Sequence, residues 1–135
     1  MELLQPKHWR LPKGFANGVA AQGRQVFVAG QVGWNADQQF ASDDFVAQVE
    51  QALRNICEVL AQAGATPQHL VRLTWYITDK REYLSRLEEV GKAYRRVIGR
   101  HFPAMTLVQV AALLEDRAKV EIEATAVIAA LRPTA

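Results

Sequence analysis

The segment from residue 105 to residue 113 limits the possible folds of this chain more than any other. Successive side chains of a strand point to opposite faces of its sheet, and in this segment both faces carry apolar side chains. A strand of this kind needs a cover on each side of its sheet. We therefore expect helices on one face and a second copy of the chain on the other. The two faces carry Met105, Leu107 and Ala111, and Val108, Val110 and Ala112.

Amphipathic helices and further strands surround this segment. Apolar residues recur every three or four positions from residue 46 to residue 63, where Ser42 is the expected N-cap, and from residue 83 to residue 97, after Asp79. Pro67 is expected to begin a single helical turn. The strands expected are 18–21 and 25–29, joined by a tight turn at 22–24, then 71–78, 105–113 and 119–128.

The order of these elements, β-β-α-β-α-β-β, predicts an α+β fold with two helices packed on one face of a mixed sheet. The chain has 135 residues and half of them are apolar, which is enough for a core without disulfides or metal ions. No linker divides the chain. We expect one domain over residues 1–135, in which residues 1–14 form an extended N-terminal arm.

Charge and cysteine content argue against several classes of function. Sixteen Lys and Arg residues and fourteen Asp and Glu residues are interspersed, so the chain shows no basic stripe for nucleic acid. The single cysteine, Cys57, cannot form an internal disulfide, and no Cys and His spacing resembles a zinc site. The N-terminus lacks the apolar core of a secretion signal, and no run is long enough to cross a membrane. We expect a soluble cytoplasmic protein.

Two glutamates on the last strand are candidates for acid–base chemistry. Glu121 and Glu123 are two positions apart, so they share one face at a separation of roughly 6 to 7 Å. On a solvated face this is ordinary alternation, whereas under a second subunit one carboxylate would be partly buried beside the other, which suits a general acid or base. His8, His69 and His101 have no partner at a catalytic spacing and are expected in loops.

Basic and aromatic side chains provide a second group of candidates. The basic cluster at the end of the second helix is either a solvated last turn, favoured by the helix dipole, or a rim that attracts anions. It contains Arg95, Arg96, Arg100 and His101. Aromatic residues that could line a pocket are Phe15, Trp34, Trp75 and Tyr76, of which Trp75 also fits the core pattern.

Three stretches resemble the reactive intermediate deaminase superfamily, called Rid or YjgF. They are GRQVFVAGQVG, QALRNICEVLAQAGATPQHLVRLTWYITD and FPAMTLVQVAALLEDRAKVEIEATAV, and the likeness runs from about Gly14 to Ile128. The resemblance implies the chorismate-mutase-like form of the α+β fold. It also implies a homotrimer with small-molecule clefts between subunits, which agrees with a strand that is apolar on both faces.

The resemblance also implies a reaction. Typical deaminating members hydrolyse imines or enamines of small 2-amino acids to keto acids and ammonia without a cofactor. In them an arginine of an FPAR motif binds the substrate carboxylate, and a glutamate of an EIEA motif lies close by. Here Glu121 matches the glutamate, but Met105 stands at the arginine position, and a thioether offers neither charge nor donors. Phe15 replaces the family's tyrosine, and Gly91 stands where a helix usually supplies an asparagine.

These residues lead to two principal hypotheses. The first is an imine or enamine hydrolase of altered specificity, with Glu121 as the catalytic residue and a pocket shaped by Phe15, Gln31, Trp34 and Met105. Its substrate would resemble 2-aminomuconate from aromatic catabolism more than an ordinary 2-imino acid. The second is a non-catalytic binding protein for a small metabolite. The older family labels, ribonuclease and translation inhibitor, are less favoured because no basic stripe is present. Neither hypothesis needs a metal ion or a cofactor.

Overall fold

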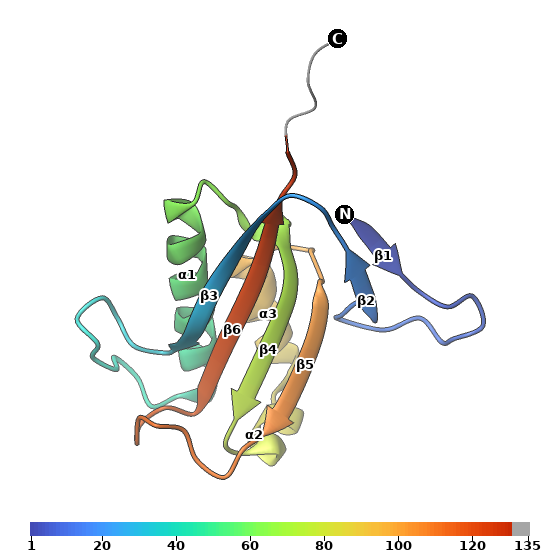
Figure 1. Cartoon of the computed structure of the whole chain (residues 1–135). Helices are drawn as coiled ribbons and strands as arrows, with labels where there is room; N and C mark the ends of the chain where they lie inside the picture. The colour runs from blue at the N-terminus through green and yellow to red at the C-terminus, as the bar shows by residue number, and fades with distance from the viewer. Residues whose placement is uncertain (131–135) are drawn as a thin grey trace.

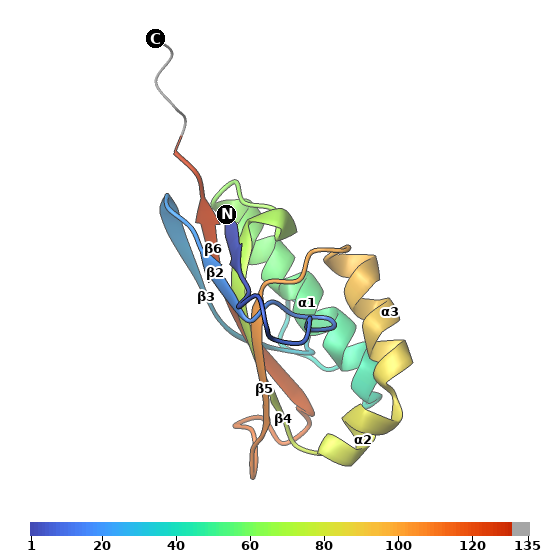
Figure 2. The ribbon, with the colours of Figure 1, turned by 90° about the vertical axis from the view of Figure 1, so that its right-hand side faces the viewer.

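The computed structural model describes residues 1–130; residues 131–135 of the expected domain lie outside the described part. In chain order the elements are β1 (Glu2–Leu4), β2 (Gly18–Ala20), β3 (Arg24–Val32), α1 (Phe45–Gln62), the 3-10 turn Pro67–His69, β4 (Leu70–Ile77), α2 (Lys80–Ser85), α3 (Leu87–Val97), β5 (Ala104–Gln109) and β6 (Val120–Ile128). The main sheet has four strands in the order β3-β6-β4-β5, of which β4 and β5 are parallel and the other pairs antiparallel (Figure 1). All three helices lie on one face of this sheet (Figure 2). The α+β class expected from the sequence is confirmed.

The N-terminal strands pair differently from what their proximity in sequence suggests. The strands on either side of the turn at residues 22–24 do not pair with each other. β2 instead pairs with β1 in a separate two-stranded sheet, so the expected arm contributes a strand of its own. β3 pairs with β6 and runs on to Val32, beyond its expected end at Ala29, because a register shift between Val28 and Gln31 accommodates the extra backbone.

The core lies between α1, α3 and the sheet. Val49, Leu53, Ile56 and Leu60, spaced three or four positions apart on α1, have no exposed surface. They give α1 the apolar stripe expected from the sequence, and the helix ends just before Gly64, whose positive φ of 74° suits glycine. β6 supplies the opposing surface and confirms the expected alternation. Its buried residues are Val120, Ile122, Ala124 and Ala126.

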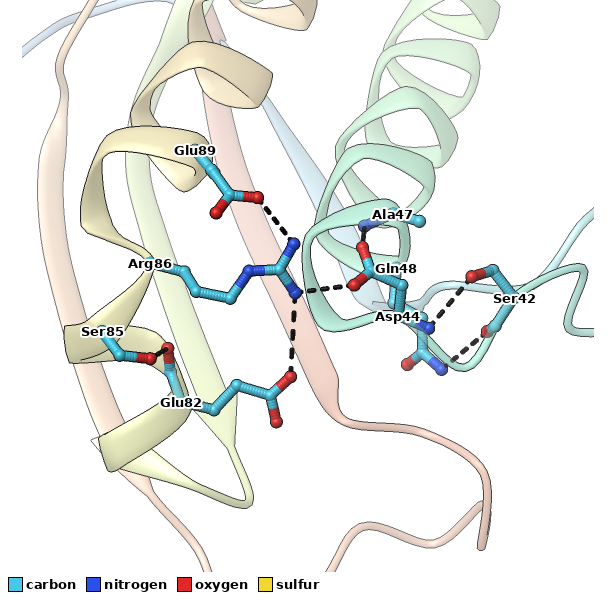
Figure 3. A network of polar contacts seen from close by, with 8 residues as sticks. All are labelled: Ser42, Asp44, Ala47, Gln48, Glu82, Ser85, Arg86 and Glu89. Carbon is cyan, nitrogen blue, oxygen red and sulfur yellow. Dashed lines mark hydrogen bonds and ion pairs between the residues drawn. The ribbon is translucent and has the colours of Figure 1, made fainter.

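Asp44, rather than the expected Ser42, caps the N-terminus of α1. The Asp44 carboxylate accepts a hydrogen bond from the backbone N–H of Ala47 at 3.0 Å (Figure 3). The Ser42 hydroxyl accepts one from the backbone N–H of Asp44 at 2.9 Å and so supports the capping residue. The Ser42 and Asp44 side-chain oxygens both accept hydrogen bonds from backbone N–H groups at this end of the helix. The sequence pattern alone does not show which residue is the N-cap.

Arg86 interrupts the single helix that the sequence predicts over residues 80–97. Its backbone (φ −127°, ψ 29°) ends α2 and begins α3. Its guanidinium lies 2.6 Å from Asp44 Oδ1, 2.6 Å from Glu89 Oε2 and 3.9 Å from Glu82 Oε1 (Figure 3). The second apolar stripe is therefore carried by two short helices, and Arg86 ties their junction to the first turn of α1.

This cluster is expected to make stability depend on pH. The Arg86 guanidinium holds the pKa values of Asp44 and Glu89 below their usual range. A carboxyl group whose pKa is lower in the folded than in the unfolded protein stabilises the fold. This stabilisation is fully present at a pH above the unfolded-state pKa of about 4, and it is lost as the pH falls through the folded-state pKa. The advantage of the wild type over Arg86→Gln, measured as the urea midpoint, should shrink between about pH 6 and about pH 3. Arg81→Gln, on the same short helix but outside the cluster, should show no such trend, and a constant gap for Arg86→Gln would contradict the assignment.

The sheet face away from the helices is uncovered within one protomer. Phe27 is 70% exposed and Val108 is 40% exposed on this face. β5 ends at Gln109, before the expected end at residue 113, although the backbone N–H of Val110 still donates to the carbonyl oxygen of Ile77 at 2.8 Å. Within residues 1–130, no helix combines the length and the apolar character needed to span a bilayer.

Candidate functional site

A cavity of about 560 Å³ lies between helices α2 and α3 and the edge strand β5. We call it the aromatic cavity, because its wall contains Phe15, Trp75, Tyr83, Tyr94 and Phe102. Aliphatic side chains of β5 and α3 add to the wall. Small-molecule sites in proteins commonly occupy about 300 to 1,000 Å³ and are mostly apolar. The aromatic cavity has both properties.

Phe15 and Met105 reach this cavity from distant parts of the sequence. The backbone N–H of Ala16 donates to the carbonyl oxygen of Pro103 at 3.0 Å, which fixes the segment of Phe15 beside the start of β5. Met105 pairs with Leu73 of β4, a fully buried residue on the helical side of the sheet. Paired residues of neighbouring strands share a face, so Met105 also faces the helices. The two residues thus form adjoining parts of one wall.

Tyr94 organises the aromatic wall. Its ring stacks on Phe102 with centroids 5.3 Å apart at 12°, and on Trp75 with centroids 6.5 Å apart at 27°. Its hydroxyl donates a hydrogen bond to the carbonyl oxygen of His101 at 2.6 Å, and burial raises its pKa, so it is neutral at physiological pH. Trp75 is 4% exposed, and within residues 1–130 its indole N–H has no hydrogen-bond partner. The wall is therefore flat and apolar, and one of its residues, Trp75, carries this unpaired donor.

The charged residues of the aromatic cavity are both positive. They are Lys13, which precedes Gly14 in the loop between β1 and β2, and Arg95, in the last turn of α3. In the part of the chain that the structure describes, no Asp, Glu or His lines the cavity. The cavity is thus suited to an anionic ligand with an apolar body.

Glu121 lies on the opposite face of the sheet. Its neighbours Val120 and Ile122 are fully buried under the helices, so its own side chain points away from the aromatic cavity. Its carboxyl group lies over Gly30, where an added Cβ would be 2.8 Å from Glu121 Cδ. The absence of a side chain at Gly30 leaves the space that this carboxylate occupies. Within one protomer, the sheet separates Glu121 from Met105.

Comparison with known proteins identifies the family. The family model described as Endoribonuclease L-PSP matches residues 11–128. The structure of YyfB from Yersinia pestis, described as a member of the conserved Rid protein family of unknown function, superposes with a TM-score of 0.83 at 33% identity, covering 94% of this chain and 98% of that one. This chain belongs to the Rid/YjgF superfamily.

Three further proteins are similar to this chain. The human 2-iminobutanoate/2-iminopropanoate deaminase is 30% identical over 105 residues, which are 77% of this chain and 73% of the human one. Protein DfrA of Myxococcus xanthus is 37% identical over 106 residues, 78% of this chain and 77% of that protein. The structure of E. coli TdcF with bound serine has a TM-score of 0.68 at 25% identity, covering 96% of this chain and 100% of TdcF.

Three residues at which this Rid chain departs from the family motifs line one cavity. Phe15, Gly91 and Met105, which stand where the resemblance implies a tyrosine, an asparagine and an arginine, all contribute to the aromatic cavity. The three positions thus belong to one wall although they are far apart in the sequence. Together they replace polar groups on one wall with apolar or small ones.

The other residues expected in the Rid site lie outside this cavity within one protomer. Trp34 packs against Phe40 with ring centroids 5.8 Å apart, and its carbonyl oxygen accepts a hydrogen bond from Asn55 at 2.8 Å. The Gln31 amide donates to the carbonyl oxygen of Ala29 at 3.1 Å. Neither residue, nor Glu121, lines the aromatic cavity.

Tyr83 and Lys13 are among the cavity residues that the sequence did not indicate. Tyr83 belongs to a helical stripe, and its edge-on contact with Phe45, with centroids 6.5 Å apart, is what such a stripe predicts. Burial raises the pKa of its hydroxyl, which therefore stays protonated at neutral pH. Lys13 lies in the expected arm. No local pattern marks either residue, because the cavity is assembled from segments that meet only in three dimensions.

Proposed function

We propose that this Rid protein is a cytoplasmic homotrimer that hydrolyses the imine or enamine of a metabolite larger and flatter than 2-iminobutanoate. The observation that carries the proposal is the convergence of Phe15, Gly91 and Met105 on one aromatic cavity of about 560 Å³. The reaction class is supported by relatives named as deaminases, including the human protein. The altered cavity wall supports a substrate different from theirs.

The reaction requires little of the protein. Water adds to the electrophilic imine carbon to give a carbinolamine, a proton reaches the nitrogen, and the C–N bond breaks to release ammonia and a carbonyl compound. An enamine first takes up a proton at carbon to become the iminium ion, which is the imine protonated on nitrogen. The site must hold the substrate, position one water and transfer protons. The protonated Tyr83 hydroxyl can donate a hydrogen bond to the substrate, and in this proposal a carboxylate orients or deprotonates the water and carries the proton.

That carboxylate is supplied, in our proposal, by a neighbouring subunit. The uncovered sheet face, on which Phe27 is 70% exposed and Val108 is 40% exposed, supports assembly through this side. Glu121 belongs to the same face, and the sheet keeps it from the cavity of its own protomer. Glu121 of one subunit would then complete the aromatic cavity of the next.

Ammonia release tests the proposed reaction. Imines generated in situ from small and aromatic amino acids, together with 2-aminomuconate, would be incubated with and without the purified protein. We expect faster ammonia release from the flat or bulky substrates and little acceleration for 2-iminobutanoate. If none of them reacts faster with the protein present, the proposal is wrong.

Met105→Arg is expected to restore activity on ordinary 2-imino acids. An arginine on this wall would offer a charged, bidentate partner to a small carboxylate, worth about a tenfold or greater gain in kcat/KM for 2-iminobutanoate. Met105→Gln, which has similar length but no charge, is the matched control and should show no gain. Equal behaviour of the two variants would mean that charge at residue 105 does not determine specificity.

A non-catalytic binding protein is the second candidate. It is favoured by the absence of Asp, Glu and His from the described lining of the aromatic cavity. A ligand that binds the cavity without being turned over, in a protein that releases no ammonia from any imine tested, would establish this alternative.

A further inference from the structure

Arg95 differs from the other basic residues of α3 in having no acidic partner. Lys92 Nζ lies 3.5 Å from Glu88 Oε1, and Arg96 Nη2 lies 2.7 Å from Glu50 Oε1. Arg95 forms no ion pair in the part of the chain that the structure describes, although it lines the aromatic cavity. Its charge is therefore available to a ligand.

Gly91 provides the space for this guanidinium. It lies one helical turn before Arg95, and a Cβ added to it would be 3.2 Å from Arg95 Nη1. The guanidinium thus lies back along α3, over a residue that has no side chain and itself lines the cavity. A glycine within a helix is unfavourable by roughly 1 kcal/mol relative to alanine, so a packing role for its small size is a reason for its presence.

The rest of the cavity specifies what the cation would bind. Among residues 1–130, Arg95 and Lys13 are the charged residues that line it, and the stacked rings of Trp75, Tyr94 and Phe102 provide a flat apolar wall. A guanidinium binds a carboxylate through two parallel hydrogen bonds, and stacked rings accept a planar apolar group. Met105, at the start of β5, offers only apolar contact.

We propose that Arg95, assisted by Lys13, binds the carboxylate of a planar, aromatic-sized acid, so that the anion site of this protein lies on helix α3 instead of strand β5. The proposal rests on the proposed function only in taking the aromatic cavity as the substrate site. The ligand is oriented with its carboxylate towards α3 and its apolar body against the stacked rings and Met105. A purely structural role for Arg95, stabilising the last turn of α3, would affect unfolding but not ligand binding.

Calorimetric titration with benzoate, and with benzamide as its uncharged counterpart, tests the proposal. We expect the wild type to bind benzoate more tightly than benzamide. Arg95→Gln should weaken benzoate binding by about 10- to 100-fold and leave benzamide binding unchanged, because it removes a charge-assisted contact. Arg95→Lys, which retains the charge but not the fork, should give an intermediate affinity.

Lys92→Gln is the matched control. It removes the same charge from the same helix outside the cavity, and its benzoate affinity should equal that of the wild type. The proposal is overturned if the wild type does not bind benzoate, or if Arg95→Gln and Lys92→Gln bind it equally. Because the assay measures binding alone, Arg95-dependent benzoate binding in a protein that releases no ammonia would reject the proposed catalysis and retain this site.

Discussion

Replacing Glu121 with glutamine is expected to slow ammonia release by about 10²- to 10⁴-fold, the usual contribution of a general acid or base. Glutamine preserves the shape of the side chain above Gly30 but can neither take up a proton nor attract one from water. The binding of the substrate is expected to change much less than kcat. The measurement is kcat on whichever imine or enamine the wild type hydrolyses best, with the molar mass in solution determined for both proteins.

Glu123→Gln is the control for this prediction. Glu123 is on the same strand and the same face, and it accepts a hydrogen bond from the Tyr76 hydroxyl at 2.8 Å. Its replacement removes one negative charge from the same surface, so it reproduces any general effect on assembly. Equal losses in the two variants would mean that the charge of this face matters rather than Glu121 itself, and no loss in Glu121→Gln would remove its catalytic role.

Replacing Gln48 with methionine is expected to lower the free energy of unfolding by about 3 kcal/mol, as several buried backbone groups lose their partner. Gln48 is 1% exposed. Its amide nitrogen donates to the carbonyl oxygens of Ser42 and Arg117, each at 3.0 Å, and its amide oxygen accepts from the backbone N–H of Lys119 at 2.8 Å. One side chain thus holds two loops against α1. The melting temperature should fall by roughly 10 °C.

Gln62→Met provides the comparison for Gln48→Met. Gln62 is exposed at the end of α1, so the same substitution there leaves no buried group unpaired. Its unfolding midpoint in urea should stay close to that of the wild type. If Gln48→Met is as stable as Gln62→Met, then water or a rearranged loop satisfies the released groups, and the inferred role of Gln48 is wrong.

Helices and strands with regularly spaced apolar residues were predictable from the sequence. Which strands pair with one another was not. The alternation of β4 and β6 and the stripe of α1 follow from the spacing of residues such as Leu53 and Ile122, since burial imposes a period on the chain. The pairing of β1 with β2 leaves no such mark, because both strands are three residues long and β1 is exposed throughout. The break at Arg86 is accompanied by an ion pair with Asp44, the capping residue of α1, and no local pattern brings these two distant residues together.

The candidate site was predictable only in part, for a similar reason. Phe15 and Met105 were indicated by the family motifs, and the structure places both in the aromatic cavity. Arg95 was one of several clustered cations, and only the three-dimensional structure shows that it has no acidic partner within residues 1–130. The roles of Glu121, Gln31 and Trp34 stay predictions, because they depend on the proposed assembly of several copies of the chain.

The parallel pairing of β4 and β5 has a consequence for how the specificity of such a protein changes. Parallel neighbours require a long crossover, and here that crossover is α2 and α3, which form the roof of the aromatic cavity. Ala93 of α3 is fully buried against the core and must be kept, whereas Gly91 and Arg95 line the cavity on the same helix. Substitutions at the cavity-lining positions of this one segment would therefore change the ligand that the cavity accepts while the pairing of β4 with β5 is kept.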